Sequence, residues 1–278
     1  MESSNFTRNR LATLATACSI AAACCAAFNS QASTYVLTDG GSTASVDLTS
    51  GAGMNYWDLG FGGNQLAQQW FWYRNGSGVA QPINLISAPT VSASTANFLE
   101  VSYGNAQFTL TLSYTLTGGG SGSGTADIFE TISVLNHSGQ TMPNFNLFQY
   151  SDFNLLGTPG GDVVSINLSP LNYVIQSEGA GNIGEVVTDP AANRAEAGLN
   201  GSILANFGIA DYDLSNVLSA GPGDASWAFQ WTAAIANGSS LDIIKDKKIT
   251  LSAIPEPSVA GLLAVSMGLA GMLRRRTS

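Results

Sequence analysis

The sequence has little of what usually cross-links an exported domain or builds a metal site. Only three of its 278 residues are cysteine (Cys18, Cys24 and Cys25), and only one, His137, is histidine. All three cysteines lie in the first 32 residues, which look like a leader segment, so the rest of the chain can form no disulfide, cysteine-ligated metal site or cysteine nucleophile. A single histidine cannot build a multi-histidine site, and Asn-His-Ser-Gly predicts an exposed turn there. The sequence therefore gives no reason to expect a metal or a cofactor.

Basic residues are also scarce. Residues 33–253 hold five lysines and arginines against 17 aspartates and glutamates, a formal charge of −12. Binding to a phosphate backbone needs clustered cations, so nucleic acid is not expected as a partner. The excess of acidic residues favours solubility and allows cations to be bound or repelled at a surface.

Long apolar runs occur only near the two ends of the chain. Arg8 and Arg10 precede an alanine-rich apolar run over 11–27, and small residues occupy the −3 and −1 positions of a cleavage site after Ala32. This order predicts a signal helix, exported by the Sec machinery and removed by signal peptidase, over residues 1–32. A lipoprotein signal with Cys24 as the lipidated residue is the alternative, but three alanines stand where such a signal usually has a large aliphatic residue.

The last 25 residues contain three parts in a fixed order. A Pro-Glu-Pro tripeptide is followed by an uncharged apolar run over 259–273 and then by three arginines. The residues concerned are Pro255, Glu256, Pro257, Arg274, Arg275 and Arg276. The prolines favour an extended segment, the apolar run predicts a single transmembrane helix, and the arginines are expected to stay on the cytoplasmic side. A run of 15 residues spans only about 22 Å as a helix, against about 30 Å of hydrocarbon, so it suits a removable segment better than a permanent anchor.

This three-part order resembles the PEP-CTERM sorting signal of exported bacterial proteins. The resemblance covers residues 254–278 and implies an exosortase partner, a membrane-embedded protease-transpeptidase that recognises and processes the tail. It further implies a Gram-negative cell that makes exopolysaccharide, a transient precursor in the inner membrane, and a final place at the cell surface or in the extracellular matrix. The tail thus predicts a destination and leaves the role of the body open.

Residues 33–253 carry the signals of β-strands. In the stretch 107–117, apolar residues alternate with threonine and serine, as in an antiparallel sheet with one buried and one wet face. Together with 98–103 and 126–135 it predicts a meander, and 34–48 predicts a hairpin. Further strands are expected over 145–150, 163–168, 173–177, 185–188, 203–207, 226–236 and 248–253. With only short helices expected, after Asp189 and Asp213, the body is predicted to be one all-β, antiparallel β-sandwich-like extracytoplasmic domain.

Carboxylates offer one candidate chemistry. Glycoside hydrolysis needs two of them at a set separation, and five lie on or near predicted strands. These are Glu100, Glu130, Asp152, Glu178 and Glu185. No pair is favoured over another, acidic residues are usually solvated, and no Gly-x-Ser-x-Gly nucleophile elbow is present. Asp211 and Asp213 resemble a calcium loop only weakly, because Pro222 stands where such a loop has its glutamate; an isolated calcium site elsewhere on the acidic surface stays open.

Aromatic side chains offer the other candidate chemistry. Trp57, Trp70, Trp72 and Tyr73 lie close together in the sequence, and exposed aromatic faces commonly stack against sugar rings. The ordinary interpretation is that these rings fill the core. Since neighbouring residues of a strand point to opposite faces, the rings at positions 70–73 cannot all enter one core.

The sequence favours a non-enzymatic cell-surface or extracellular-matrix protein of unassigned role, sorted through its tail. Two targeting segments and the lack of a recognisable catalytic constellation motivate this interpretation. The alternative is a carbohydrate-binding module that binds exopolysaccharide through its surface aromatics, and a glycan-active enzyme with two carboxylates comes third.

Overall fold

The alternation of apolar and hydroxyl residues over 107–117 builds the centre of one sheet. In the computed structural model, which describes residues 34–252, this stretch is β8 (Phe108–Gly118), whose apolar side chains are buried while those between them are partly exposed. It pairs with β7 (Phe98–Gly104) and β9 (Thr125–Asn136), which confirms the predicted meander. β1 (Thr34–Asp39) and β2 (Ser42–Asp47) confirm the predicted hairpin.

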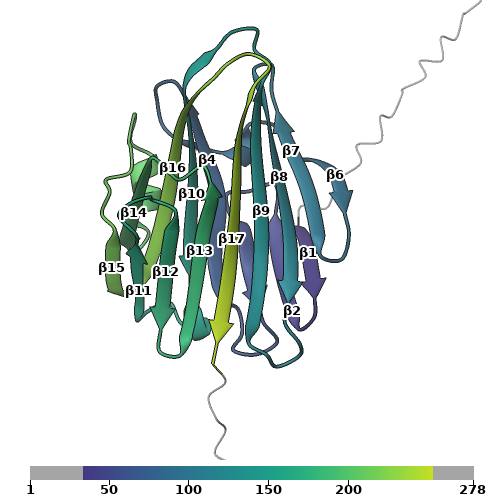
Figure 1. Ribbon diagram of the computed structural model, residues 1–278, viewed down its shortest axis with the longest axis vertical. Helices are drawn as coiled ribbons and strands as arrows, with labels where there is room; N and C mark the ends of the chain where they lie inside the picture. The colour runs from purple at the N-terminus through teal and green to yellow at the C-terminus, as the bar shows by residue number, and fades with distance from the viewer. Residues whose placement is uncertain (1–33, 253–278) are drawn as a thin grey trace, which may run out of the picture. The chain divides into compact units, whose positions relative to one another are not determined.

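The described strands form two sheets packed face to face, with sheet B in front of sheet A in Figure 1. Sheet A has eight strands: β1, β2, β3 (Gly53–Asp58), β4 (Leu66–Asn75), β10 (Met142–Phe153), β16 (Ala225–Ile235) and β14 (Arg194–Leu199) in spatial order, with β5 (Gln81–Pro82) pairing β4. Sheet B has nine: β15 (Ser219–Gly223), β11 (Asp162–Ile166), β12 (Tyr173–Glu178), β13 (Gly181–Asp189), β17 (Ser240–Leu251), β9, β8, β7 and β6 (Thr90–Ser94). Neighbours run antiparallel except β3 and β4. The predicted antiparallel, all-β body is confirmed.

Large rings from both sheets fill the space between them. Phe108 of sheet B packs edge-on against Phe145 of sheet A, with ring centroids 5.2 Å apart. Phe153 stacks on Trp227 at 5.3 Å. Burial of rings of this size supplies most of the apolar area removed from water in such a sandwich.

Charged side chains also lie between the sheets, forming a cluster called here the buried tetrad: Glu130 of β9, Glu185 of β13, and Lys245 and Lys247 of β17. All four are at most 1% exposed. The Lys245 ammonium lies 2.6 Å from Glu130 and 3.5 Å from Glu185, and it donates a 2.5 Å hydrogen bond to Gln149 of sheet A. Lys247 pairs with Glu130 and lies 3.9 Å from Glu185. Two ammonium groups thus face two carboxylates, which is the condition for burying charge at all.

The structure corrects three predicted elements. Residues 203–207, expected as a strand, belong to α1 (Ser202–Phe207), which buries Ile203 and Phe207 at helical spacing. No helix begins after Asp189, where β13 ends. The chain instead continues into β14, which forms an edge of sheet A beside β16. No helix follows Asp213, where the chain runs without regular structure up to β15.

Helix is otherwise limited, within residues 34–252, to two short 3-10 turns, η1 (Ile83–Leu85) and η2 (Leu155–Gly157). In this part of the chain no helix is long and apolar enough to cross a membrane. The predicted signal helix, transmembrane helix and sorting motif lie outside the described residues.

Candidate functional site

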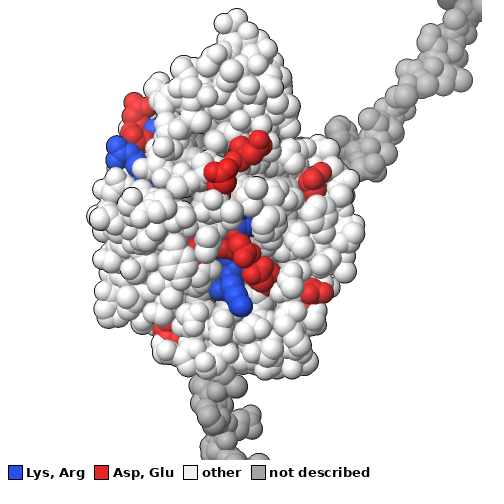
Figure 2. Space-filling model, in the orientation of Figure 1, with Lys and Arg blue, Asp and Glu red and all other residues white. Residues whose placement is uncertain are grey.

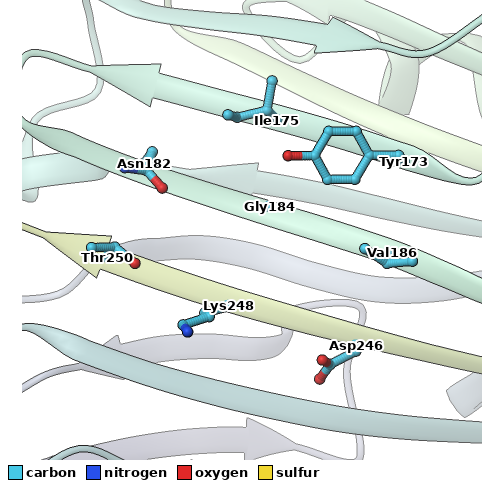
Figure 3. Close-up of a pocket in the computed structure, with 8 residues that line it drawn as sticks. All are labelled: Tyr173, Ile175, Asn182, Gly184, Val186, Asp246, Lys248 and Thr250. Atoms are coloured by element: carbon cyan, nitrogen blue, oxygen red, sulfur yellow. The ribbon is translucent and has the colours of Figure 1, made fainter.

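The outer face of sheet B carries a groove of about 300 Å³ across three neighbouring strands. We call it the Tyr173 groove, and Figure 3 shows its lining. It is lined by Tyr173 and Ile175 of β12, Asn182, Gly184 and Val186 of β13, and Asp246, Lys248 and Thr250 of β17. These are the alternate residues of each strand whose side chains point away from the core.

The strand register sets the order of these side chains. Tyr173 lies opposite Val186, and Val186 lies opposite Asp246 on the next strand. In the adjacent row, Gly184 lies between Ile175 and Lys248. A Cβ on Gly184 would come 3.5 Å from the Tyr173 hydroxyl, so the tyrosine ring extends over the bare backbone of that glycine (Figure 3). The missing side chain therefore creates the hollow, and the ring bounds it.

Charged side chains of both signs lie together near the centre of this face, most of which is uncharged (Figure 2). Asp127 of β9 is directly opposite Lys248, and therefore diagonal to Asp246. Partial burial, together with a hydrogen bond to Asp246 and its charge, raises the pKa of Asp127 to about 7, while Lys248 acts in the opposite direction. At neutral pH the Asp127 carboxyl group is therefore protonated part of the time.

One oxygen of Asp246 has no hydrogen-bond partner. Its Oδ1 is buried and accepts no hydrogen bond from any described residue. A buried carboxylate oxygen without a donor is costly, and an enclosed water molecule can donate to it.

The groove combines apolar and polar walls. Tyr173 is 39% exposed, and Val186 and Ile175 are similarly open, so an apolar surface with one aromatic ring faces solvent. Asn182, Thr250, Lys248 and Asp246 present donors and acceptors opposite it. This composition suits a small ligand with one apolar face and many hydroxyl groups.

Within residues 34–252, no group of three or more histidine, cysteine, aspartate or glutamate side chains is arranged to hold a metal ion.

The aromatic residues expected to stack on sugar lie in the interior. Trp57 and Trp70 are fully buried, and Trp72 is 7% exposed beneath Phe207 of α1. Tyr73 packs on the inner face against Phe108 of sheet B. Both faces of β4 are covered, the inner one by sheet B and the outer one in part by α1. The expectation of an open ring face is therefore corrected for the three tryptophans, while Tyr73 is partly buried.

The five candidate carboxylates do not form a reachable pair. Glu130 and Glu185 meet only within the buried tetrad, with two lysines between them and solvent excluded. Burial raises the pKa of Asp152 to about 6, but Asp152 hydrogen-bonds with Tyr150 on the outer face of sheet A. The carboxylates of Glu100 and Glu178 accept hydrogen bonds from Ser92 and Thr158. His137 lies 3.2 Å from the Thr109 hydroxyl, in an exposed position.

Sequence reasoning missed Tyr173, Asp127, Asp246 and Lys248 as site residues. The stretch Lys245–Lys248 does contain a signal, because its charges alternate between the two faces of one strand. That pattern shows that Asp246 and Lys248 share a face, but only the pairing of β17 with β9 and β13 adds Asp127 and the tyrosine.

No family model matches this chain, and no curated protein matches it. Solved structures do resemble its fold. A bacterial glucoamylase complexed with acarbose matches with a TM-score of 0.56 and 7% identity, over 78% of this chain and 32% of that one. A protein described as an aldose 1-epimerase, from Escherichia coli K12, matches with a TM-score of 0.53 and 10% identity, over 79% of this chain and 99% of that one. The chain thus spans about a third of the glucoamylase, and identities this low show the fold alone.

This likeness contradicts the first interpretation of the sequence, a non-enzymatic surface or matrix protein of unassigned role. Both similar proteins are carbohydrate-active enzymes by description. Of the interpretations of the sequence, these descriptions favour the alternative, a carbohydrate-binding module, over the first.

Proposed function

We propose that this domain binds a carbohydrate in the Tyr173 groove. The observation that carries the proposal is the exposed Tyr173 ring over the bare backbone of Gly184, beside Asp246 and Lys248, with Asp127 on the next strand. The fold likeness to carbohydrate-active proteins supports the same conclusion independently of these residues.

The groove offers the two kinds of contact that a sugar ring needs. The apolar face of a pyranose can lie on Tyr173 and Val186, whose exposed area then leaves water. The hydroxyl groups at the ring edge can hydrogen-bond with Asn182 and with the charged centre.

The charged centre can both donate and accept hydrogen bonds. Lys248 donates through its ammonium group, Asp127 donates through its O–H when it is protonated, and the outer oxygen of Asp246 accepts. Hydrogen bonds of this kind, with one ionised partner, are about twice as strong as neutral ones. A hydroxyl group, which is both donor and acceptor, complements such a set better than a purely anionic ligand does.

The test is titration calorimetry with sugars selected on a glycan array. Replacing Tyr173 with alanine should weaken binding about five- to tenfold, because a stacked ring contributes about 1 kcal/mol beyond its buried area. Tyr173→Phe keeps the ring and should retain most of the affinity. Tyr56→Ala, on sheet A, is the matched control and should bind as the unchanged protein does. A protein that binds no sugar on the array, or whose affinity ignores Tyr173→Ala, would refute the proposal.

A second candidate function is proton transfer to the bound sugar. The observation favouring it is the position of Asp127 opposite Lys248, at the edge of the groove, where partial burial raises its pKa to about 7. A carboxyl group with a pKa in this range exchanges protons best at neutral pH. Interconversion of the anomers of a reducing sugar needs such a transfer between the anomeric hydroxyl and the ring oxygen. The rate of anomer exchange, followed by polarimetry, should rise with added protein and return to the background rate in Asp127→Asn. A rate unaffected by the protein would rule out this second function.

We also propose that the domain reaches its ligand outside the cytoplasm. The motivation is the order of residues in the two end segments, both outside the described structure. Signal peptidase would cut after Ala32, and an exosortase would process the tail at the Pro-Glu-Pro motif. Intact-mass measurement should find a shorter product in the wild type than in Glu256→Ala, and identical masses would contradict this expectation.

A further inference from the structure

A second groove lies beside the first on the outer face of sheet B. It has a volume of about 280 Å³, and we call it the Thr117 groove. It is lined by Thr117, Gly118 and Gly119 at the end of β8, Thr125, Ala126 and Asp127 of β9, and Lys248. Lys248 lines both grooves, so the Asp127–Lys248 pair lies at the boundary between them.

The two grooves lie along one straight row of paired residues. Ile175, Gly184 and Lys248 are directly opposite one another on β12, β13 and β17, and the row continues through Asp127 to Thr117. Neighbouring strands are about 4.8 Å apart, so the row runs about 19 Å across the strands. This length is several times the width of one sugar ring.

The neighbouring row supplies an aromatic ring to each half. Across the sheet from Tyr173 come Val186, Asp246 and then Phe129, each opposite the last. Phe129 is 41% exposed, nearly the same as Tyr173. Three interstrand steps, about 14 Å, separate the strands that carry the two rings, so a single sugar ring cannot lie on both.

The row on the other side of Gly184, Lys248 and Asp127 is polar. In it Asn182 of β13 lies opposite Thr250 of β17, which in turn lies opposite Thr125 of β9. The two grooves therefore lie on a strip about five strands wide. Tyr173, Val186, Asp246 and Phe129 follow one another along one side of it, and hydroxyl and amide groups lie along the other. A linear chain of sugars has the same two-sided character along its length, with ring faces and hydroxyl edges.

From this geometry we infer that the ligand is an oligosaccharide chain lying across the strands, with sugar units in both grooves. The inference rests on the proposed function of the Tyr173 groove and extends it. The linkage between the two units lies over Asp127 and Lys248, where donors and acceptors are concentrated. Phe129, which lies beside the Thr117 groove in the row next to Asp127 and Lys248, is the stacking platform of the second unit, and Thr117 borders the position of that unit.

The experiment compares saccharides of increasing length by calorimetry, from the monosaccharide that binds best to its tetrasaccharide. Affinity should rise at least tenfold between the two. Phe129→Ala should remove most of this gain and leave the monosaccharide affinity unchanged, and Thr117→Arg should do the same by blocking the second groove. Tyr173→Ala should instead weaken every length.

The matched control is Leu135→Ala. Leu135 lies on the same strand as Phe129, points outward and is 42% exposed, but it lies toward the end of β9, away from Asp127 and Lys248. It should keep the full dependence on chain length. Thermal unfolding of each variant verifies that an altered affinity comes from a folded protein.

The outcomes separate the inference from the function on which it rests. If monosaccharide and tetrasaccharide bind equally well, or if Phe129→Ala and Thr117→Arg both keep the gain with length, the second groove is not a subsite, while the Tyr173 groove stands. If no saccharide of any length binds, both proposals fail together.

Discussion

Neutralising one carboxylate of the buried tetrad should destabilise the whole domain. The change is Glu130→Gln, which keeps the shape of the side chain and removes its charge. Glu130 is the tetrad member that contacts both lysines, Lys245 at 2.6 Å and Lys247 through its other oxygen. After the change, two buried ammonium groups share only Glu185, at 3.5 and 3.9 Å.

The size of the effect follows from this imbalance of charge. Breaking a buried ion pair by removing one partner costs about 3–5 kcal/mol, because the remaining charge stays desolvated. Coulomb's law gives a similar figure, about 4 kcal/mol for unit charges 4 Å apart at an effective dielectric constant of 20. We therefore expect Glu130→Gln to lower the free energy of unfolding by about 3–5 kcal/mol at pH 7.

Lys247 makes this cost depend on pH. Burial already lowers the pKa of Lys247 to about 8, although Glu130 and Glu185 oppose the shift. When the pKa of a lysine is lower in the folded than in the unfolded state, the protein becomes more stable as pH rises from the folded to the unfolded value. Loss of Glu130 lowers this pKa further, so Lys247 can lose its proton and relieve part of the imbalance. The cost of Glu130→Gln should therefore be larger at pH 6 than at pH 9.

Removing one lysine together with Glu130 should recover much of the loss. Glu130→Gln combined with Lys247→Met leaves Lys245 and Glu185 as a balanced pair. The double variant should be more stable than the sum of the two single changes predicts, by about 2 kcal/mol, within the range of coupling measured for neighbouring residues. Lys248→Met is the matched control, since it removes a lysine from the exposed face of the same strand, and it should change stability by less than about 1 kcal/mol.

Urea unfolding followed by tryptophan fluorescence measures these values, because all five tryptophans are buried in the folded state. An unchanged m-value would show that the variants unfold from equally compact states. The reasoning is refuted if Glu130→Gln costs less than about 1 kcal/mol at pH 7, or if the two single changes add without coupling.

Three further predictions concern other parts of the sandwich. Iodide should quench little tryptophan emission until the protein unfolds, since every indole is at most 7% exposed; ready quenching in native buffer would contradict the described core. The raised pKa of Asp127 means that the native state keeps a proton that the unfolded state releases, so the free energy of unfolding should fall as pH rises from about 4 to 7. Asp127→Asn should flatten this pH dependence in thermal melts. An unchanged pH dependence in the variant would show that Asp127 is not its source. Gly53 has φ +57°, and a Cβ there would collide with the Trp70 ring. Gly53→Ala should therefore lower the free energy of unfolding by about 1–3 kcal/mol more than Gly76→Ala, whose added Cβ meets open space. Equal losses for the two variants in urea unfolding would contradict the collision.

The sequence by itself determined the all-β class and several strands. Alternation along 107–117 is a local property, because successive side chains of a strand point to opposite faces, so β8 and its meander could be predicted from it. The same rule shows that Lys245 and Lys247 share one face of a strand while Asp246 and Lys248 share the other. Local pattern failed at 203–207, because a short apolar segment fits a helix turn or a strand equally well until its neighbours are known.

Only the tertiary structure decided which of those two charged faces is buried. Lys247 lies inside because Glu130, 117 residues away in the chain, and Glu185 arrive on the flanking strands to balance it. The same pairings bring Tyr173 and Asp127 to the outer face beside Asp246 and Lys248. They also leave β4 covered on both sides, so its tryptophans join the core. Strand register joins residues that are distant in sequence, and both the buried tetrad and the outer grooves depend on it because their chemistry requires contacts across neighbouring strands.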